Sequence, residues 1–175
     1  MNTLNLPDGT TLLGLEAEAR RQGSGITPDN LQGEWWLDQL WSRQAGEQTT
    51  TASMLRGIGA CLAITLASGA NGDSELHLRN SVRVGPAVLQ FSGPGWLSGK
   101  RPLLRFRFER MALLWGDREL WHAALPTPSA QRMPFFALIA CERSGDQGWL
   151  AARGRGGGLA AWRLRPSLRP SAPRD

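Results

Sequence analysis

Two histidines and two cysteines are the side chains of this chain with the widest chemical range near neutral pH. His77 and His122 have no cysteine at metal-ligand spacing, and both are predicted to lie on the surface. Cys61 and Cys141 form no Cys-x-x-Cys pair, so we predict buried free thiols rather than a disulfide. These residues indicate neither a catalytic centre nor a metal site.

Other motifs with known chemistry are incomplete. Glu34, Asp38 and Glu47 are scattered carboxylates without an obvious pairing, and there is no Gly-x-Ser-x-Gly nucleophile elbow. The segment 57–61 has two glycines of a dinucleotide-binding fingerprint, lacks the third, and begins a predicted strand. We therefore expect a non-catalytic protein without a cofactor.

An arginine- and glycine-rich segment spans residues 153–158. It lacks the Lys-Ser/Thr of a phosphate-binding P-loop, and no helix is predicted after it. A second interpretation is a nucleic-acid-binding segment, but this segment is short and is flanked by strand sequence on both sides. We interpret it as a hairpin turn in which Arg153, Gly154 and Gly157 belong to a structural motif at a barrel end. We expect its arginine to pack on a tryptophan there.

The strongest local motif is the run 33–37, in a chain with 8 Trp and 0 Tyr. Gly33 would let the chain enter a barrel closely, and Trp35 would plug one end of it. An indole suits that place because it is large and its N–H needs a partner, which free backbone carbonyls at a barrel end provide. We therefore predict a structural role for both residues.

The elements that must position these residues alternate between apolar and polar side chains with period two. Segments 76–84 and 104–108 predict antiparallel strands with apolar residues inside and arginine outside. After Glu109 the apolar parity flips, which predicts a bulge or bend near Arg110. Together with the turn signals, the pattern predicts a mainly β protein. We expect an antiparallel up-and-down β-barrel of about eight or nine strands over 31–165.

Turns and flanking segments are predicted from local composition. Tight hairpins are expected at 71–72 and 116–117, and looser turns at 85–86 and 144–146. Longer loops are expected over 92–102 and 124–134. A short helix over 11–22 and a loop form the N-terminal part (1–30), and the segment 166–175 is predicted to be disordered.

The formal net charge is +5 at pH 7. Residues 163–175 carry four arginines and one aspartate, which is +3, so the rest of the chain carries only +2. This distribution is a weak signal for nucleic acid, which we do not expect as a partner. Four arginines are predicted on the outer face: Arg79, Arg83, Arg105 and Arg107. They could contact anionic lipid headgroups or simply be solvated, and both interpretations stay open.

Three segments resemble the plastid lipid-associated protein family, the fibrillins, in a short cyanobacterial form. They are the entry 31–37 after a short helix, the alternating strand 103–109 and the closing block 149–157. The chain departs from the family at Arg155, where the family has an acidic residue, and in its shorter N-terminal helix. The resemblance implies a lipocalin-like barrel that binds lipids, quinones or carotenoids near thylakoid membranes.

From these observations we expect a cavity that binds a hydrophobic molecule. The residues predicted to line it are Leu37, Trp41, Val82, Phe91, Phe106 and Phe108. An alternative function is a bilin lyase or chaperone for phycobiliproteins, which would need an acid or a cysteine in the cavity. A basic nucleic-acid binder is a third possibility. No signal peptide or membrane span is evident, so we expect a cytoplasmic location, peripheral to the thylakoid membrane if the resemblance holds.

Overall fold

The computed structural model describes residues 4–42, 59–68 and 74–166, which form two α-helices, ten strands and one short 3₁₀ helix. The elements in chain order are α1 (Gly9–Gln22), α2 (Pro28–Leu31), β1 (Gly33–Trp41), β2 (Cys61–Ser68), β3 (Ser74–Val84), β4 (Ala87–Ser98), β5 (Leu103–Phe106), β6 (Arg110–Trp115), β7 (Arg118–Ala124), η1 (Ala130–Arg132), β8 (Phe135–Ser144), β9 (Gln147–Gly154) and β10 (Leu159–Arg165).

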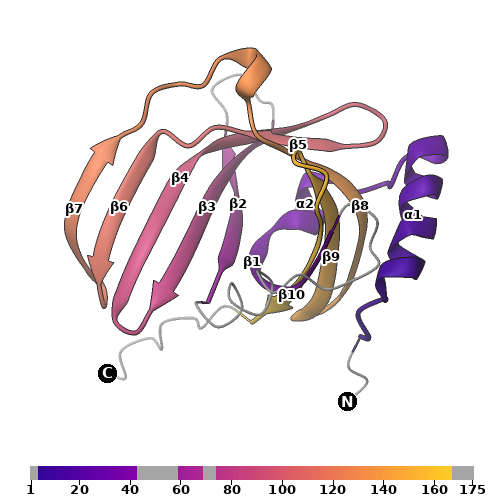
Figure 1. Ribbon diagram of the computed structural model, residues 1–175, viewed down its shortest axis with the longest axis horizontal. Helices are drawn as coiled ribbons and strands as arrows, with labels where there is room; N and C mark the ends of the chain where they lie inside the picture. Colours follow the sequence, from indigo (N-terminus) through magenta and orange to yellow (C-terminus); the bar gives the residue numbers. More distant parts are fainter. Residues whose placement is uncertain (1–3, 43–58, 69–73, 167–175) are drawn as a thin grey trace.

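Eight of the strands close into an antiparallel barrel (Figure 1). Their order is β3-β2-β1-β10-β9-β8-β5-β4, and the pairing of β3 with β4 completes the circle. The main core lies inside this barrel, where apolar side chains from alternate positions of each strand meet. The predicted mainly β barrel with a short N-terminal helix is thus confirmed.

Strands β6 and β7 lie outside the closed barrel and extend its sheet to one side (Figure 1). One edge of β4 is shared between two partners: Ala87–Ser92 pair with β6, and Gly95–Ser98 pair with β5. The β4 strand therefore belongs both to the barrel and to this continuation of its sheet, which we call the β6–β7 extension.

The predicted irregularity near Arg110 is a β-bulge between β5 and β6. From Gly95 to Ser92 the β4 strand advances three positions, while the opposite chain advances four, from Phe106 to Arg110. The extra residue reverses the parity, as the sequence indicated. Met111 pairs with Phe91, and both lie on the face of the sheet that continues the barrel interior.

The predicted loop over 92–102 is largely wrong, because β4 continues as a strand to Ser98. The glycines of this segment allow neighbouring chain segments to pack closely against β4, and they do not form a loop. A Cβ on Gly93 would lie 2.1 Å from the carbonyl oxygen of Arg107, and one on Gly95 would lie 2.3 Å from Leu78 Cδ1. Glycine within a strand commonly marks such a tight crossing, and proline is tolerated beside a bulge.

Three of the predicted turns are two-residue hairpins. The turn at 116–117 is tight, as expected, and those at 85–86 and 145–146 are equally tight rather than looser. Gly85, Gly116 and Gly145 each have φ near +60°, which glycine adopts without steric cost. The predicted turn at 71–72 and most of the segment 166–175 lie outside the described residues.

Helix α1 packs against the outside of the barrel, next to β8 and the β9–β10 hairpin (Figure 1). Asp8 caps it by accepting a hydrogen bond from the Thr11 N–H at 2.7 Å, and Gly23 ends it. A second core cluster lies beneath it, containing Leu12, Trp41 and Trp149. Part of the loop predicted after the helix over 11–22 is the short helix α2, which begins with a Thr27–Asn30 capping box. Neither described helix is long and apolar enough to cross a membrane.

Candidate ligand cavity and its surroundings

Trp35 fills one end of the barrel, as the sequence predicted. Its side chain is fully buried, and its indole Nε1–H donates a hydrogen bond to the Leu31 carbonyl at 2.6 Å. Gly33, at φ +134°, permits this entry, because a Cβ there would lie 2.5 Å from Leu164 Cδ1. The barrel is therefore packed solid at the Trp35 end.

The other half of the barrel is hollow, with a cavity of about 290 Å³. Its lining side chains are mostly apolar, and Asn80 adds one amide. The lining residues are Leu37, Leu40, Ala60, Cys61, Leu62, Asn80, Val82, Phe106, Phe108, Phe136, Gly154, Gly158, Ala160 and Trp162. None of these described lining residues carries a carboxylate. Such a cavity can enclose an apolar group and offer it one oriented hydrogen bond.

Four of the six residues predicted for the cavity line it: Leu37, Val82, Phe106 and Phe108. Phe91 stands behind Phe108, with the two ring centroids 5.8 Å apart. The bulge near Arg110 preserves this arrangement, because it keeps the apolar side chains of β5 and β6 on one face.

The prediction for Trp41 is wrong. A register shift in β1 between Leu37 and Gln39 reverses the parity, so Leu40 turns into the cavity and Trp41 turns outward. Trp41 packs in the cluster beneath α1 and is only 5% exposed. Sequence alternation assumes an unbroken strand, and nothing in the local composition announces the bulge at Asp38.

Aromatic rings form a continuous row along the cavity wall. The order of the rings is Phe108, Phe106, Phe136 and Trp162. The centroids of successive rings are 5.2, 5.3 and 5.4 Å apart. Phe136 and Trp162 also line the cavity and were not predicted from the sequence. Phe135 and Phe136 are consecutive, so parity alone could not tell which of them faces inward. The Trp162 signal was available, since it alternates with Ala160 and Leu164 on β10.

The turn between β9 and β10 is confirmed as a hairpin, in which the Gly154 N–H donates to the Gly158 carbonyl at 2.9 Å. The expected packing of its arginine on the barrel-end tryptophan is wrong. Trp35 pairs with Leu164, near the far end of β10 from the turn, so the two features lie at opposite barrel ends. The described cation–π contact joins Arg165 to Trp36, with 4.4 Å from Cζ to the ring centroid.

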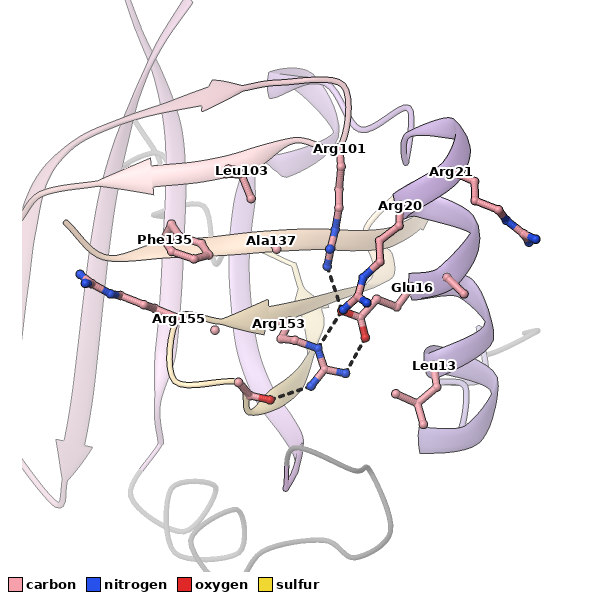
Figure 2. A pocket seen from close by; sticks show the side chains of 13 residues that line it. Leu13, Glu16, Arg20, Arg21, Arg101, Leu103, Phe135, Ala137, Arg153 and Arg155 are labelled. Atoms are coloured by element: carbon pink, nitrogen blue, oxygen red, sulfur yellow. Dashed lines mark hydrogen bonds and ion pairs between the residues drawn. The ribbon is translucent and has the colours of Figure 1, made fainter. Parts of the chain in front are cut away.

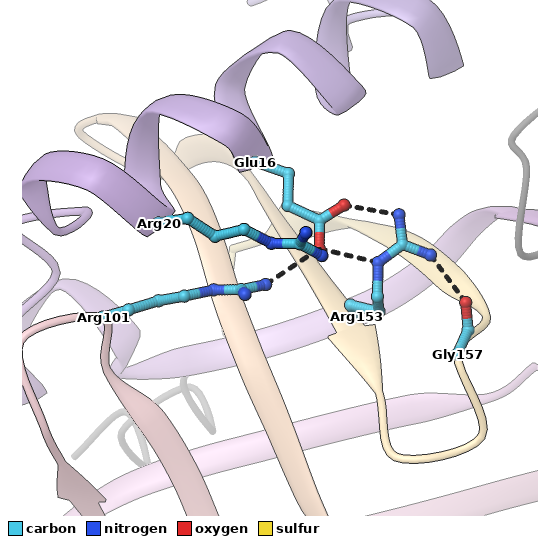
Figure 3. A network of polar contacts seen from close by, with 5 residues as sticks. All are labelled: Glu16, Arg20, Arg101, Arg153 and Gly157. Carbon is cyan, nitrogen blue, oxygen red and sulfur yellow. Dashed lines mark hydrogen bonds and ion pairs between the residues drawn. The ribbon is translucent and has the colours of Figure 1, made fainter.

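Arg153 instead donates to the carboxylate of Glu16 on α1 and to the Gly157 carbonyl (Figures 2 and 3). Gly157 has φ +86°, so this turn needs its glycine. The barrel-end motif predicted from Arg153, Gly154 and Gly157 thus fastens the helix to the barrel. Gly154 also lies on the wall of the cavity.

Glu16 is a buried carboxylate, 3% exposed, that was not predicted as a site residue from the sequence. Arg20, Arg101 and Arg153 all donate to it. Burial by itself would raise the pKa of Glu16, but the hydrogen bonds and charges of Arg153 and Arg20 outweigh it and hold the pKa at about 2. Its i, i+4 spacing to Arg20 was a visible signal; its burial was not.

An exposed apolar surface continues from the cavity wall onto the β6–β7 extension. Cross-strand pairing puts five side chains on the same face as Val82 and Phe91, and each is between 37% and 61% exposed. We call this the apolar face; it consists of Val84, Leu89, Leu113, Trp115 and Trp121. Contiguous exposed apolar surface of this kind commonly marks an interaction site.

The predicted outer arginines lie on the opposite side of the sheet or at its bulge. Arg79, Arg83 and Arg105 are exposed. Arg79 lies 3.9 Å from a Glu34 carboxylate oxygen, and Arg107 pairs with Glu109 at 2.7 Å. Contact with anionic lipid stays a prediction for this set.

The remaining residues of chemical interest are separate from each other. His77 and His122 are exposed, and His122 lies 2.7 Å from a Glu119 oxygen. Cys61 and Cys141 are free thiols; Cys61 is buried and Cys141 only partly so. Burial raises the pKa of Cys61 to about 12 and that of Cys141 to about 11. Over the described ranges, no group of three or more histidine, cysteine or acidic residues could hold a metal ion.

Neither a scan against protein-family models nor a search of the curated proteins finds a match to this chain.

Proposed function

We propose that this protein binds a hydrophobic small molecule, such as a lipid, quinone or carotenoid, in the barrel cavity, without chemically changing it. The observation that carries the proposal is the mostly apolar cavity in the half of the barrel opposite Trp35. Burial of apolar ligand surface there contributes about 25 cal/mol per Å². The amide of Asn80 offers a partner for a ligand carbonyl or hydroxyl.

The size of the cavity limits what it can enclose. At about 290 Å³ it lies at the lower end of the ~300–1,000 Å³ range of small-molecule pockets. A ring or the end of a chain fits, whereas a complete lipid or carotenoid does not. We infer that the rest of a long ligand lies along the apolar face, which continues the cavity wall beyond Val82 and Phe91.

The apolar face also supports work at or near a membrane surface. Trp115 and Trp121 are 57% and 49% exposed on a sheet extension that the closed barrel does not need. Tryptophan is favoured at the boundary between water and hydrocarbon. A hydrophobic ligand could then pass between the membrane and the cavity without crossing bulk water.

A test of the cavity uses two variants on the same strand. Trp162 lines the cavity, so a benzoquinone probe without a tail should quench tryptophan fluorescence saturably. Val82→Phe fills the cavity and should weaken binding at least about tenfold. Val84→Phe, two residues further on the same face but 61% exposed, should bind like the wild type. Absence of saturable quenching, or equal binding by both variants, would refute the proposal.

A second test concerns the apolar face. In calorimetry, replacing Trp115 and Trp121 together by serine should weaken binding of a quinone with a long isoprenoid tail and leave the tail-less quinone unaffected. The same variant should sediment less with lipid vesicles. If the long-tailed quinone and the vesicles bind it as they bind the wild type, the apolar face has no part in the function.

A further inference from the structure

A second pocket, separate from the barrel cavity, lies outside the barrel beneath α1. It measures about 850 Å³ and is bounded by the helix, the start of β5, β8 and the β9–β10 hairpin (Figure 2). The two pockets share Gly154 of the hairpin among their lining residues. Whatever enters this second pocket does not occupy the barrel interior.

The charge of the second pocket is strongly unbalanced. Five arginines line it against one carboxylate, Glu16, which leaves a formal charge of +4. The arginines are Arg20, Arg21, Arg101, Arg153 and Arg155. The chain as a whole carries +5. Positive charge of this density on a concave surface attracts anions from solution.

Hydrogen-bond donors exceed acceptors around Glu16 (Figure 3). Its Oε1 accepts from Arg20 at 2.8 Å, from Arg101 at 2.9 Å and from Arg153 at 2.7 Å, and its Oε2 accepts from Arg153 at 2.5 Å. One carboxylate is thus shared by three guanidinium groups, each with five N–H donors. The Nε of Arg101 is buried and has no partner among the described residues. Arg20 and Arg101 each donate to Glu16 through Nη2, so other N–H groups of these two side chains can donate to an added anion.

A purely structural role needs fewer cations. The bidentate contact between Arg153 and Glu16 is enough to fasten α1 to the barrel, because it already joins the helix to the β9–β10 hairpin. Arg20 and Arg101 bring two more positive charges to the same carboxylate, from α1 and from the segment before β5. Like charges held this close repel each other, and an added anion would relieve that repulsion.

The geometry points to a phosphate group as the missing anion. Guanidinium groups match phosphate oxygens in planar, charge-assisted pairs, and those of Arg20, Arg101 and Arg153 converge here. Arg21 and Arg155 point away from this cluster (Figure 2), and Arg155 donates to the backbone carbonyls of residues 131 and 133. Leu103, Phe135 and Ala137 form an apolar floor beside the arginines (Figure 2). We propose that the second pocket binds the phosphate of an organic phosphate ester, with the guanidinium groups on the phosphate and the apolar floor on the organic part.

Calorimetric titration of the full chain at low salt tests this proposal. Phenyl phosphate should bind saturably, and more tightly than inorganic phosphate because of the apolar floor. Arg101→Gln and, separately, Arg20→Gln should each weaken binding about tenfold, since each removes charge-assisted donors. Each of these variants leaves Glu16 its contact with Arg153. Arg118→Gln, an exposed arginine of the β6–β7 extension, is the matched control and should bind like the wild type.

Vesicles distinguish the source of the phosphate. Phosphatidylglycerol vesicles, compared with phosphatidylcholine vesicles, report whether a lipid headgroup can enter the pocket. The site is supported if Arg101→Gln and Arg20→Gln lose binding of phenyl phosphate or of the vesicles. The probe whose binding is lost identifies the source of the phosphate. The proposal is overturned if no phosphate probe binds below about 1 mM. It is also overturned if Arg118→Gln weakens binding as much as the two pocket variants do. Melting curves verify that each variant is folded.

Discussion

At the scale of single residues, Glu16 connects stability to pH. Its pKa of about 2 lies below the ordinary value of 4.5, so the ionised carboxylate stabilises the folded state above pH 4.5. This contribution, about 3 kcal/mol from the difference in pKa, should be lost as the pH falls from 4.5 towards 2. Urea unfolding followed by tryptophan fluorescence measures it.

Glu16→Gln should lose this pH dependence and be about 3 kcal/mol less stable at pH 7, because three arginines lose the carboxylate that they share. Glu18→Gln, at an exposed position of the same helix, is the control and should retain the wild-type pH profile. Identical profiles for the two variants would show that the Glu16 network contributes little.

Two glycines at contrasting positions should respond in opposite directions to alanine. Gly33→Ala puts a Cβ 2.5 Å from Leu164 at φ +134° and should cost about 2 kcal/mol. Gly14→Ala lies within α1 with no atom within 4 Å of the new Cβ, and should stabilise the protein by up to about 1 kcal/mol. Thermal melting of both variants measures the difference; a stable Gly33→Ala would mean that the barrel entry is not tightly packed.

At the scale of elements, the β5–β6 bulge decides where the aromatic row stands. The N–H groups of Arg107 and Glu109 donate to the Pro94 and Ser92 carbonyls, at 3.1 and 2.9 Å. Gly93→Ala would drive a Cβ into the Arg107 carbonyl and should destabilise the protein by at least about 2 kcal/mol.

The same Gly93→Ala change should also weaken quinone binding, because Phe106 and Phe108 flank the bulge. Gly156→Ala, in the β9–β10 turn with open space around it, is the matched control and should change stability by less than about 0.5 kcal/mol. A Gly93→Ala protein with wild-type stability and binding would show that the crossing at Gly93 can relax without cost.

At the scale of the whole molecule, the two thiols report how the barrel opens. With pKa values of about 12 and about 11, both are protonated and unreactive at pH 8. We expect a thiol reagent such as dithiobis-nitrobenzoate to react about 100-fold more slowly with the native protein than in urea. Complete native reaction within the mixing time would contradict the buried placement of Cys61.

The sequence by itself determined the period-two strands, the Trp35 plug, helix α1 and the parity flip at Arg110, because each is a local pattern of side-chain type and spacing. It also predicted four cavity residues, Leu37, Val82, Phe106 and Phe108, because each keeps the inward parity of the strand pattern up to the nearest bulge. It could not predict the outward turn of Trp41, since the bulge at Asp38 forms through pairing with β10.

Tertiary structure alone decided the two features on which the proposals depend. Glu16 and Arg153 are 137 residues apart and become partners only when α1 packs on the barrel. The apolar face exists because β4 divides one edge between β5 and β6, which leaves apolar side chains of the extension uncovered. Both depend on contacts between segments that are far apart in the sequence, and such contacts cannot be predicted from the spacing of residues along the chain.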